Sequence, residues 1–202
     1  MNLNDITIII TTYKSSKKII SCLNSINKKC KVIIVENSRD QSLKQFVEKK
    51  YQNIECLLPD SNLGYGKGNN LALKKVRTKF SLILNPDTIL EKDALENFTR
   101  RVQENLDFAI IGPAKYQNEK KTNFNSELQD VENIKGFAMF LNMKKFEPIG
   151  FFDENFFLYF EEIDLCKRVK NKGEKIYLDS KIDIFHEGAK SVDEDFNFEI
   201  EL

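Results

Sequence analysis

The sequence predicts an α/β protein in which a mostly parallel central sheet carries helices on both faces. Residues 6–12 form a β-branched apolar run without alternation, which is typical of a strand buried on both faces of a parallel sheet. Strand-like and helix-like segments then alternate along residues 1–90, a pattern that predicts right-handed crossovers. No repeat or linker divides the 202 residues, so a single domain is expected over residues 1–202.

The expected elements follow in order along the chain. Ser15 or Ser16 can cap a helix, because apolar residues recur at helical spacing from Ile19 to Ile26. Strands are then expected at 31–35, 54–58 and 80–84, separated by helices near 40–50 and 66–77. Beyond these, the sequence predicts a helix near 91–104, a strand at 108–111, an irregular polar loop at 115–133, an apolar segment at 136–141, a helix at 161–171 and strands at 174–178 and 182–186.

The composition excludes several classes of function. Lys and Arg together number 31, as do Asp and Glu, so the chain lacks the basic excess of a nucleic-acid-binding protein. No apolar run approaches the ~20 residues that span a bilayer, and no signal peptide is recognisable. We therefore expect a cytoplasmic protein without a transmembrane segment, at most peripheral to the inner face of the cell membrane. The four dispersed cysteines favour reduced thiols over disulfides or a structural zinc site.

Polar segments follow the predicted strands, and ligands of α/β sheets bind at the carboxyl ends of the strands. Asn85-Pro86-Asp87 comes directly after the strand at 80–84. The carboxylate of Asp87 is well placed there to ligate a hard cation, Mn²⁺ or Mg²⁺, that bridges a diphosphate. A simple Pro-Asp turn, with Asp87 or Thr88 capping a helix, explains the same residues equally well.

Residues 62–70 contain three glycines at the start of the predicted helix at 66–77. Backbone amides at a helix start attract phosphate, and Lys67 adds a positive charge. The glycine spacing fits neither the dinucleotide fingerprint nor the phosphate-loop motif, so a tight glycine-rich turn remains an alternative.

The segment Phe160-Glu161-Glu162-Ile163-Asp164-Leu165 opens a predicted helix. A rotation of about 100° per residue places Glu162 on the side of Ile163 and Cys166, so we expect Glu162 to face inward. Partial burial raises the pKa of a carboxyl toward that of a useful general base. Asp164 is a second catalytic candidate, although an ion pair with Arg168 four residues later accounts for it as well.

His186 is the only histidine, and it ends the apolar run 182–185. A structural role is the usual one for such a histidine, but its place at a strand end, like that of Asp87, makes an oxygen-and-nitrogen metal site conceivable. Residues 151–160 are rich in aromatic side chains. We expect core packing for most of these rings, with part of an acceptor groove as the alternative.

Six ordered motifs, at residues 12–13, 35–38, 62–64, 84–88, 160–165 and 186, together resemble family 2 glycosyltransferases. The nearest subgroup looks like the bacterial rhamnosyltransferase-like enzymes of cell-surface polysaccharide assembly. The resemblance implies the GT-A fold, with a nucleotide-binding half at about 1–90 and an acceptor half at about 91–190. It further implies an inverting transfer from a UDP- or dTDP-type sugar donor to a hydroxyl of a saccharide or lipid-linked saccharide acceptor.

The resemblance also assigns roles to single positions. Asp87 would bind Mn²⁺ or Mg²⁺ together with His186, and Glu162 would be the general base. The residues that would border the donor nucleotide and its diphosphate are Thr11, Thr12, Tyr13, Glu36, Asn62, Gly64, Lys67, Gly68, Asn85 and Asp87.

Three positions depart from the family pattern, because Glu36, Asn85 and Glu162 stand where an Asp is usual. A non-catalytic nucleotide-sugar-binding or assembly subunit is therefore an alternative. A sugar-nucleotide pyrophosphorylase fits less well, because it needs a glycine-rich loop after the first strand and residues 11–15 contain no glycine.

Overall fold

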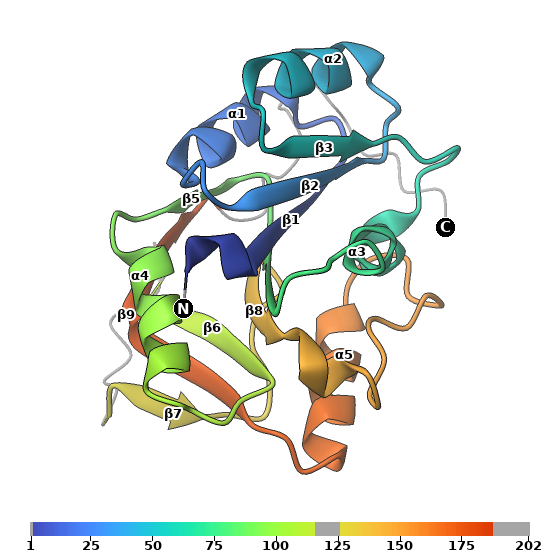
Figure 1. Cartoon of the computed structure of the whole chain (residues 1–202). Helices are drawn as coiled ribbons and strands as arrows, with labels where there is room; N and C mark the ends of the chain where they lie inside the picture. Colours follow the sequence, from blue (N-terminus) through green and yellow to red (C-terminus); the bar gives the residue numbers. More distant parts are fainter. Residues whose placement is uncertain (1, 116–125, 188–202) are drawn as a thin grey trace.

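The computed structural model describes residues 2–115 and 126–187, which form an α/β fold around a mixed sheet (Figure 1). The strands are β1 (Ile6–Thr12), β2 (Lys31–Glu36), β3 (Ile54–Leu57), β4 (Phe80–Leu84), β5 (Thr88–Leu90), β6 (Ile110–Lys115), β7 (Leu128–Asp130), β8 (Ala138–Asn142) and β9 (Ile176–His186). The helices are α1 (Ser16–Ser25), α2 (Gln41–Lys50), α3 (Gly64–Leu73), α4 (Ala94–Gln103) and α5 (Glu161–Asn171), with 3₁₀ turns at Leu3–Asp5 and Met143–Phe146.

The strand order is β3-β2-β1-β4-β8-β6-β9-β5, with β7 added beside β9. The half that contains β3, β2, β1 and β4 is parallel, as expected. β8 then enters antiparallel to both β4 and β6, and β9 runs antiparallel to β5 and β7. β6 and β9 are parallel as well, so the sheet is mixed, and the α/β fold expected from the sequence is confirmed.

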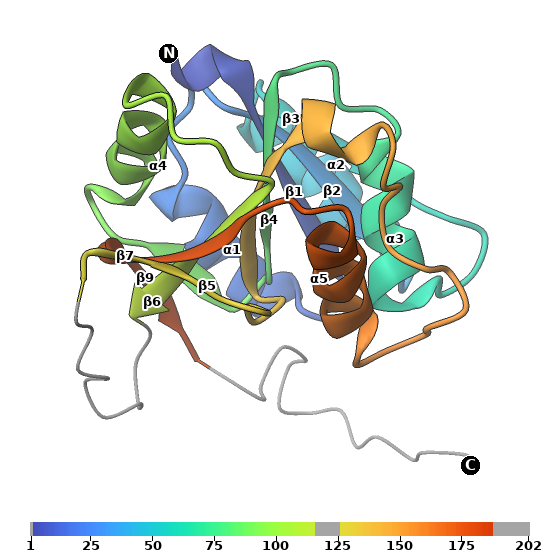
Figure 2. The same cartoon turned by 90° about the horizontal axis from the view of Figure 1, so that it is seen from below.

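β1 shows why this chain forms a sheet with two covered faces. Ile8 and Ile10 belong to one apolar cluster, which α1, α2 and α4 complete. Ile9, between them, belongs to a second cluster with residues of α3 and α5. Since successive side chains of a strand point to opposite faces, a β-branched run without alternation supplies both layers (Figure 2).

Two contacts attach α4 to the sheet. Phe98 of α4 packs on Phe140 of β8 with ring centroids 4.7 Å apart, and Phe140 also stacks on Phe80 at 5.4 Å. Arg101 Nε donates to Oδ2 of Asp179 on β9 at 2.6 Å, and both side chains are buried. The hydrogen bond to Asp179 raises the pKa of Arg101 above its ordinary value, and this effect is larger than the opposite effect of burial.

Several elements differ from expectation. The strands expected at 174–178 and 182–186 are one strand, β9, because its polar interruption contains Asp179, which the ion pair with Arg101 accommodates. β5 and β7 were not expected, and β7 lies inside the predicted irregular loop. α3 begins earlier than predicted, at Gly64, and ends at Leu73. Within residues 2–115 and 126–187, no helix is long and apolar enough to cross a membrane.

Candidate active site

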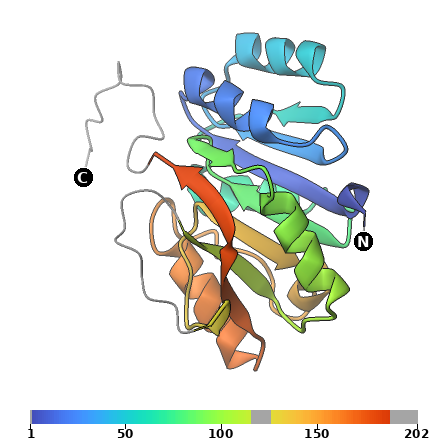
Figure 3. The same ribbon diagram turned by 90° about the vertical axis from the view of Figure 1, so that its left-hand side faces the viewer.

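The segment after β4 is a turn that connects β4 to β5. Thr88 Oγ1 donates to the carbonyl of Asn85 at 2.7 Å, and the Asn85 amide donates to the carbonyl of Phe137 at 2.9 Å. Thr88 pairs directly with His186 in the antiparallel register of β5 and β9. In Figure 3, β9 is the red strand. The turn foreseen as an alternative therefore exists, but neither Asp87 nor Thr88 caps a helix, because the turn leads into β5. The turn also brings Asp87 beside His186.

Asp87 and His186 meet at the carboxyl end of β4. Nε2 of His186 lies 3.5 Å from Oδ1 of Asp87, whose side chain is fully buried. The imidazole stacks on Phe137, with centroids 4.3 Å apart and planes inclined by 7°. Phe137 thus fixes the ring orientation, a role that the sequence did not reveal because Phe137 belongs to an ordinary apolar run.

The atoms gathered here fit a divalent cation in part. Nε2 of His186 and Oδ1 of Asn85 are buried, and neither has a hydrogen-bond partner among the described residues. Imidazole nitrogen and carboxylate or amide oxygen are ligands of Mn²⁺-type ions. No group of three or more His, Cys, Asp and Glu gathers in residues 2–115 and 126–187. A cation held at Asp87 and His186 would consequently need further oxygen ligands, such as those of a diphosphate.

The glycine-rich segment 62–70 opens α3, and its contacts are mainly internal. Gly64 has φ +73°, and a Cβ on it would lie 2.1 Å from the carbonyl oxygen of Phe157. A Cβ on Gly68 would lie 2.7 Å from Cγ2 of Thr11. The Gly64 amide donates to Oδ1 of Asn62 at 3.0 Å, so the first amide of α3 is already satisfied. Close packing therefore explains both glycines, while Lys67 on the same helix is exposed.

The residues expected around the nucleobase lie at the ends of β1 and β2. Thr11 is buried and donates to Oδ1 of Asn69 on α3 at 2.9 Å. The hydroxyl of Thr12 is buried and has no hydrogen-bond partner among the described residues. Tyr13, half-buried, follows in the loop after β1, with the Lys14 amine 5.4 Å from its ring centroid.

Glu36 has a local structural role. Its carboxylate accepts hydrogen bonds from the Ser38 hydroxyl, from the Ser38 amide at 3.0 Å and from the Asp40 amide at 2.5 Å. Both carboxylate oxygens therefore stabilise the turn between β2 and α2. The nucleotide contact implied for Glu36 stays a prediction.

The first turn of α5 orients its acidic residues partly as expected. The buried side of α5 contains Glu161 together with Leu165, whereas Ile163 is exposed. Glu161 precedes Leu165 by four residues and so shares its side of the helix. Glu162 is half-buried at the edge of this side and lies along Gly136, where a Cβ would be 3.4 Å from the Glu162 Cβ. Glu162 is therefore partly buried on the side of Cys166, as expected, whereas Ile163 does not share that buried side.

Glu161 is a buried carboxyl that the sequence did not single out. Burial, and then the negative charge of Glu162, raise its pKa above the ordinary value. Oε2 of Glu161 has no hydrogen-bond partner among the described residues. The only sequence signal for it was its spacing from Leu165.

Asp164 forms the ion pair that was foreseen as its alternative role. Nε of Arg168 donates to Oδ2 of Asp164 at 2.7 Å. The same guanidinium donates to the carbonyls of Ile149 at 3.1 Å and Phe151 at 2.6 Å. Asp164 therefore orients Arg168, which holds the start of the aromatic stretch, and a direct part in catalysis stays a prediction.

The aromatic stretch itself differs from expectation. Phe152 is buried, but residues 157–160 are all exposed. Core packing for most of these rings is therefore wrong, because the chain between Phe152 and α5 turns outward rather than across the sheet.

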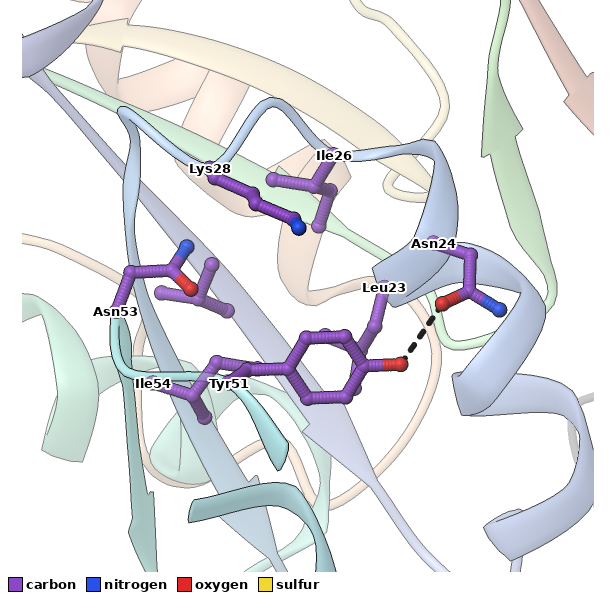
Figure 4. Close-up of a pocket in the computed structure, with 8 residues that line it drawn as sticks. Leu23, Asn24, Ile26, Lys28, Tyr51, Asn53 and Ile54 are labelled. Atoms are coloured by element: carbon purple, nitrogen blue, oxygen red, sulfur yellow. Dashed lines mark hydrogen bonds between the residues drawn. The ribbon is translucent and has the colours of Figure 1, made fainter. Parts of the chain in front are cut away.

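A separate cavity of about 60 Å³ lies at the opposite edge of the sheet (Figure 4). Ile26, Tyr51 and Ile54 line it near the amino ends of β2 and β3, and the Tyr51 hydroxyl donates to Oδ1 of Asn24 at 2.8 Å. Because Asp87 follows the carboxyl end of β4, the cavity lies away from the candidate site.

The sequence matches the glycosyl transferase family 2 over residues 7–166. It is 28% identical over 211 residues to the low-salt glycan biosynthesis hexosyltransferase Agl10 of Haloferax volcanii, covering 91% of this chain and 67% of Agl10. It is 24% identical over 199 residues to the rhamnosyltransferase WbbL of Escherichia coli K12, covering 80% of this chain and 74% of WbbL.

Solved structures show the same fold. Staphylococcus aureus TarS 1–349 in complex with UDP-GlcNAc superposes with a TM-score of 0.71 at 21% identity, covering 89% of this chain and 57% of TarS 1–349. The mannosyltransferase PcManGT of Pyrobaculum calidifontis, in complex with GDP-Man and Mn²⁺, gives 0.74 at 12% identity, covering 90% of this chain and 56% of PcManGT. The chain thus spans less than two thirds of these solved chains, and the GT-A glycosyltransferase fold is the part they share.

Proposed function

The chain belongs to glycosyl transferase family 2, and we propose that it transfers a sugar from a UDP- or dTDP-sugar to an acceptor hydroxyl, with inversion at the anomeric carbon. The pairing of Asp87 with His186 at the carboxyl end of β4 carries the proposal. The names of the relatives Agl10 and WbbL favour an acceptor in glycan assembly, of the surface polysaccharide or glycolipid type.

The donor would bind along the carboxyl edge of the parallel half of the sheet. The free hydroxyl of Thr12 and the ring of Tyr13 are suited to the nucleoside, and the exposed amine of Lys67 is suited to the diphosphate. Asp87 and His186 would hold Mn²⁺ or Mg²⁺ together with the diphosphate oxygens, and such an ion neutralises charge on a leaving diphosphate. The complexes of TarS with UDP-GlcNAc and of PcManGT with Mn²⁺ are consistent with this arrangement.

The acceptor would be activated by Glu162. As the acceptor oxygen bonds to the anomeric carbon, the bond from that carbon to the diphosphate breaks and the hydroxyl proton passes to the Glu162 carboxylate. Glu162 suits this role because it stands at the border of solvent. It lies along Gly136, and the Tyr65 hydroxyl donates a hydrogen bond to the Gly136 carbonyl at 2.5 Å. Glu161, which is buried behind it, is not placed to meet an acceptor.

Calorimetric titration with UDP, dTDP and GDP, each with and without Mn²⁺, tests the donor site. We expect at least one of these nucleotides to bind wild-type protein in a Mn²⁺-dependent manner, and Asp87→Ala to lose that dependence. Asp183→Ala is the matched control, because Asp183 is exposed on β9, the strand that carries His186. Affinity that is indifferent to Mn²⁺, or to Asp87→Ala, contradicts the metal site.

Release of nucleoside diphosphate from a panel of UDP- and dTDP-sugars then tests turnover. We expect Mn²⁺-dependent release from at least one donor. Binding without release would instead identify a nucleotide-sugar-binding subunit.

A further inference from the structure

An exposed apolar segment lies directly before the proposed base. The exposed fractions in residues 157–160 are 56% for Phe157, 42% for Leu158, 70% for Tyr159 and 65% for Phe160. Ile163, on the first turn of α5, is 44% exposed. A contiguous apolar surface of this kind costs free energy in water and is typical of a binding site.

The segment is attached firmly to α3 at its start. The carbonyl of Phe157 accepts a hydrogen bond from the Tyr65 amide at 2.9 Å, and Gly64 leaves no room for a Cβ beside it. Upstream, the Asn70 side chain donates to the Phe152 carbonyl at 2.8 Å and accepts from the Phe152 amide at 3.0 Å. The exposed rings are therefore presented on an anchored support, which lowers the entropy that binding would cost.

The backbone of the segment has an unusual conformation. Tyr159 and Phe160 are consecutive left-handed residues, with φ of 69° and 70°. Aromatic residues rarely adopt this region because it is sterically strained, and such strain gathers at ligand sites. Relaxing it would redirect both rings, so the strain maintains their outward position.

Charge distinguishes between the ligands that an apolar surface could take. The first turn of α5 is acidic, with Glu161, Glu162 and Asp164, and its basic residues lie in the last turn. Carboxylates beside the rings would repel an anionic lipid surface. A sugar ring, by contrast, presents an apolar C–H face for stacking and hydroxyl groups that donate to carboxylates.

We propose that Tyr159 and Phe160 form a stacking surface for a neutral pyranose ring of the acceptor, with the Glu162 carboxylate accepting from the hydroxyl groups of that ring. The acceptor is then a saccharide at the position that receives the new linkage. The chemical step rests on the proposed function, whereas the binding of a sugar ring by this surface does not.

The test removes one ring without disturbing the backbone. Tyr159→Asn suits it, because Asn tolerates the left-handed region, and Tyr159→Phe retains the ring without its hydroxyl. Phe46→Ala is the matched control, since Phe46 is 47% exposed on α2. Saturation-transfer difference NMR with the methyl glycosides of glucose, galactose, mannose, rhamnose and N-acetylglucosamine measures binding, and a UDP titration with Mn²⁺ checks the donor site.

We expect at least one glycoside to bind wild type, Tyr159→Phe and Phe46→Ala alike, and Tyr159→Asn to weaken that binding by roughly tenfold, with UDP affinity unchanged. Undiminished binding to Tyr159→Asn, or no glycoside bound by wild type, overturns the proposal. Tyr159-dependent binding to phosphatidylglycerol vesicles without glycoside binding overturns it in favour of a lipid surface. Tyr159-dependent glycoside binding without any sugar transfer or nucleotide binding supports the stacking surface while removing the proposed function.

Discussion

Nε2 of His186 lies 3.5 Å from Oδ1 of Asp87, although Asp87 lies in the turn after β4 and His186 ends β9. The antiparallel register of β5 and β9 sets this distance, because Thr88 is the direct partner of His186. The three-residue strand β5, which follows the turn after β4, thus connects this turn to β9. Whatever holds that register also holds the proposed cation site.

The first prediction concerns His186 as a ligand. His186→Phe keeps a ring to stack on Phe137 but removes the nitrogen, so we expect Mn²⁺-dependent UDP binding to weaken on the order of 10–100-fold with little loss of thermal stability. His186→Ala should lose stability in addition, because the stack is lost as well. Calorimetry and thermal unfolding separate the two effects. Unaltered UDP affinity in His186→Phe would mean that the imidazole only packs.

The second prediction concerns Gly64. An alanine there would be strained by its positive φ and would also clash with the carbonyl of Phe157. Gly173 has a similar φ of +75°, and a Cβ there would have no atom within 4 Å. Gly173→Ala should therefore lower the free energy of unfolding only by the cost of the left-handed backbone, about 1–2 kcal/mol. Urea unfolding should show a larger loss for Gly64→Ala. Equal losses of unfolding free energy in the two variants would show that residues 157–160 move away from the new Cβ without destabilising the fold.

The third prediction concerns the buried pair between α4 and β9. Arg101→Met leaves the fully buried Asp179 without its main partner, which should lower the free energy of unfolding by about 3–5 kcal/mol. The double variant Arg101→Met with Asp179→Asn should recover part of this loss, because no unpaired charge remains. Denaturant unfolding measures both. A loss below about 1 kcal/mol in the single variant would mean that water reaches Asp179.

The fourth prediction concerns the pH dependence of stability. Because burial raises the pKa of Glu161 in the folded state, its ionisation destabilises the fold as pH rises from the unfolded-state pKa through the folded-state pKa. Glu161→Gln should therefore raise the Tm relative to wild type more at about pH 7.5 than at about pH 4.

Glu48 provides a control of opposite sign. A hydrogen bond from Lys44 lowers the pKa of Glu48, so its stabilisation is present above the unfolded-state pKa and is lost as pH falls through the folded-state pKa. Glu48→Gln should therefore lose Tm relative to wild type at about pH 7.5 and much less at about pH 4. A Glu161→Gln effect that is the same at both pH values would show that water solvates Glu161 in the folded state.

The strands that the sequence predicted best are those with long apolar runs. β1 and β4 stand almost where the pattern placed them, because β-branched residues buried on both faces leave few alternatives. β5 and β7 were missed, because three residues carry no periodic signal. β9 was divided in two, because Asp179 looks like an interruption until Arg101 on a distant helix is known to meet it.

The site shows a similar division. The rule that ligands bind at strand ends selected Asp87 and His186 as candidates, and the structure places the two side chains 3.5 Å apart, while their role as metal ligands stays a prediction. On α5 the sequence correctly placed Cys166 on the buried side but missed that Glu161 is buried and that Ile163 is exposed. Helical spacing determines which residues share a side of α5, but contacts with α3 and the sheet determine which side faces the core. The outward turn of residues 157–160 depends on Gly64, far away in sequence, and so lay beyond local patterns.

The most direct test of the account compares Glu162→Gln with Glu161→Gln in single-turnover sugar transfer, using the donor and acceptor that support wild-type activity. If Glu162 takes the acceptor proton, Glu162→Gln should slow transfer by about 10²–10⁴-fold while Mn²⁺-dependent nucleotide binding stays unchanged. Glu161→Gln should retain transfer within about a few-fold of wild type, because its carboxyl is buried away from the acceptor. Transfer by Glu162→Gln at the wild-type rate would contradict the central claim.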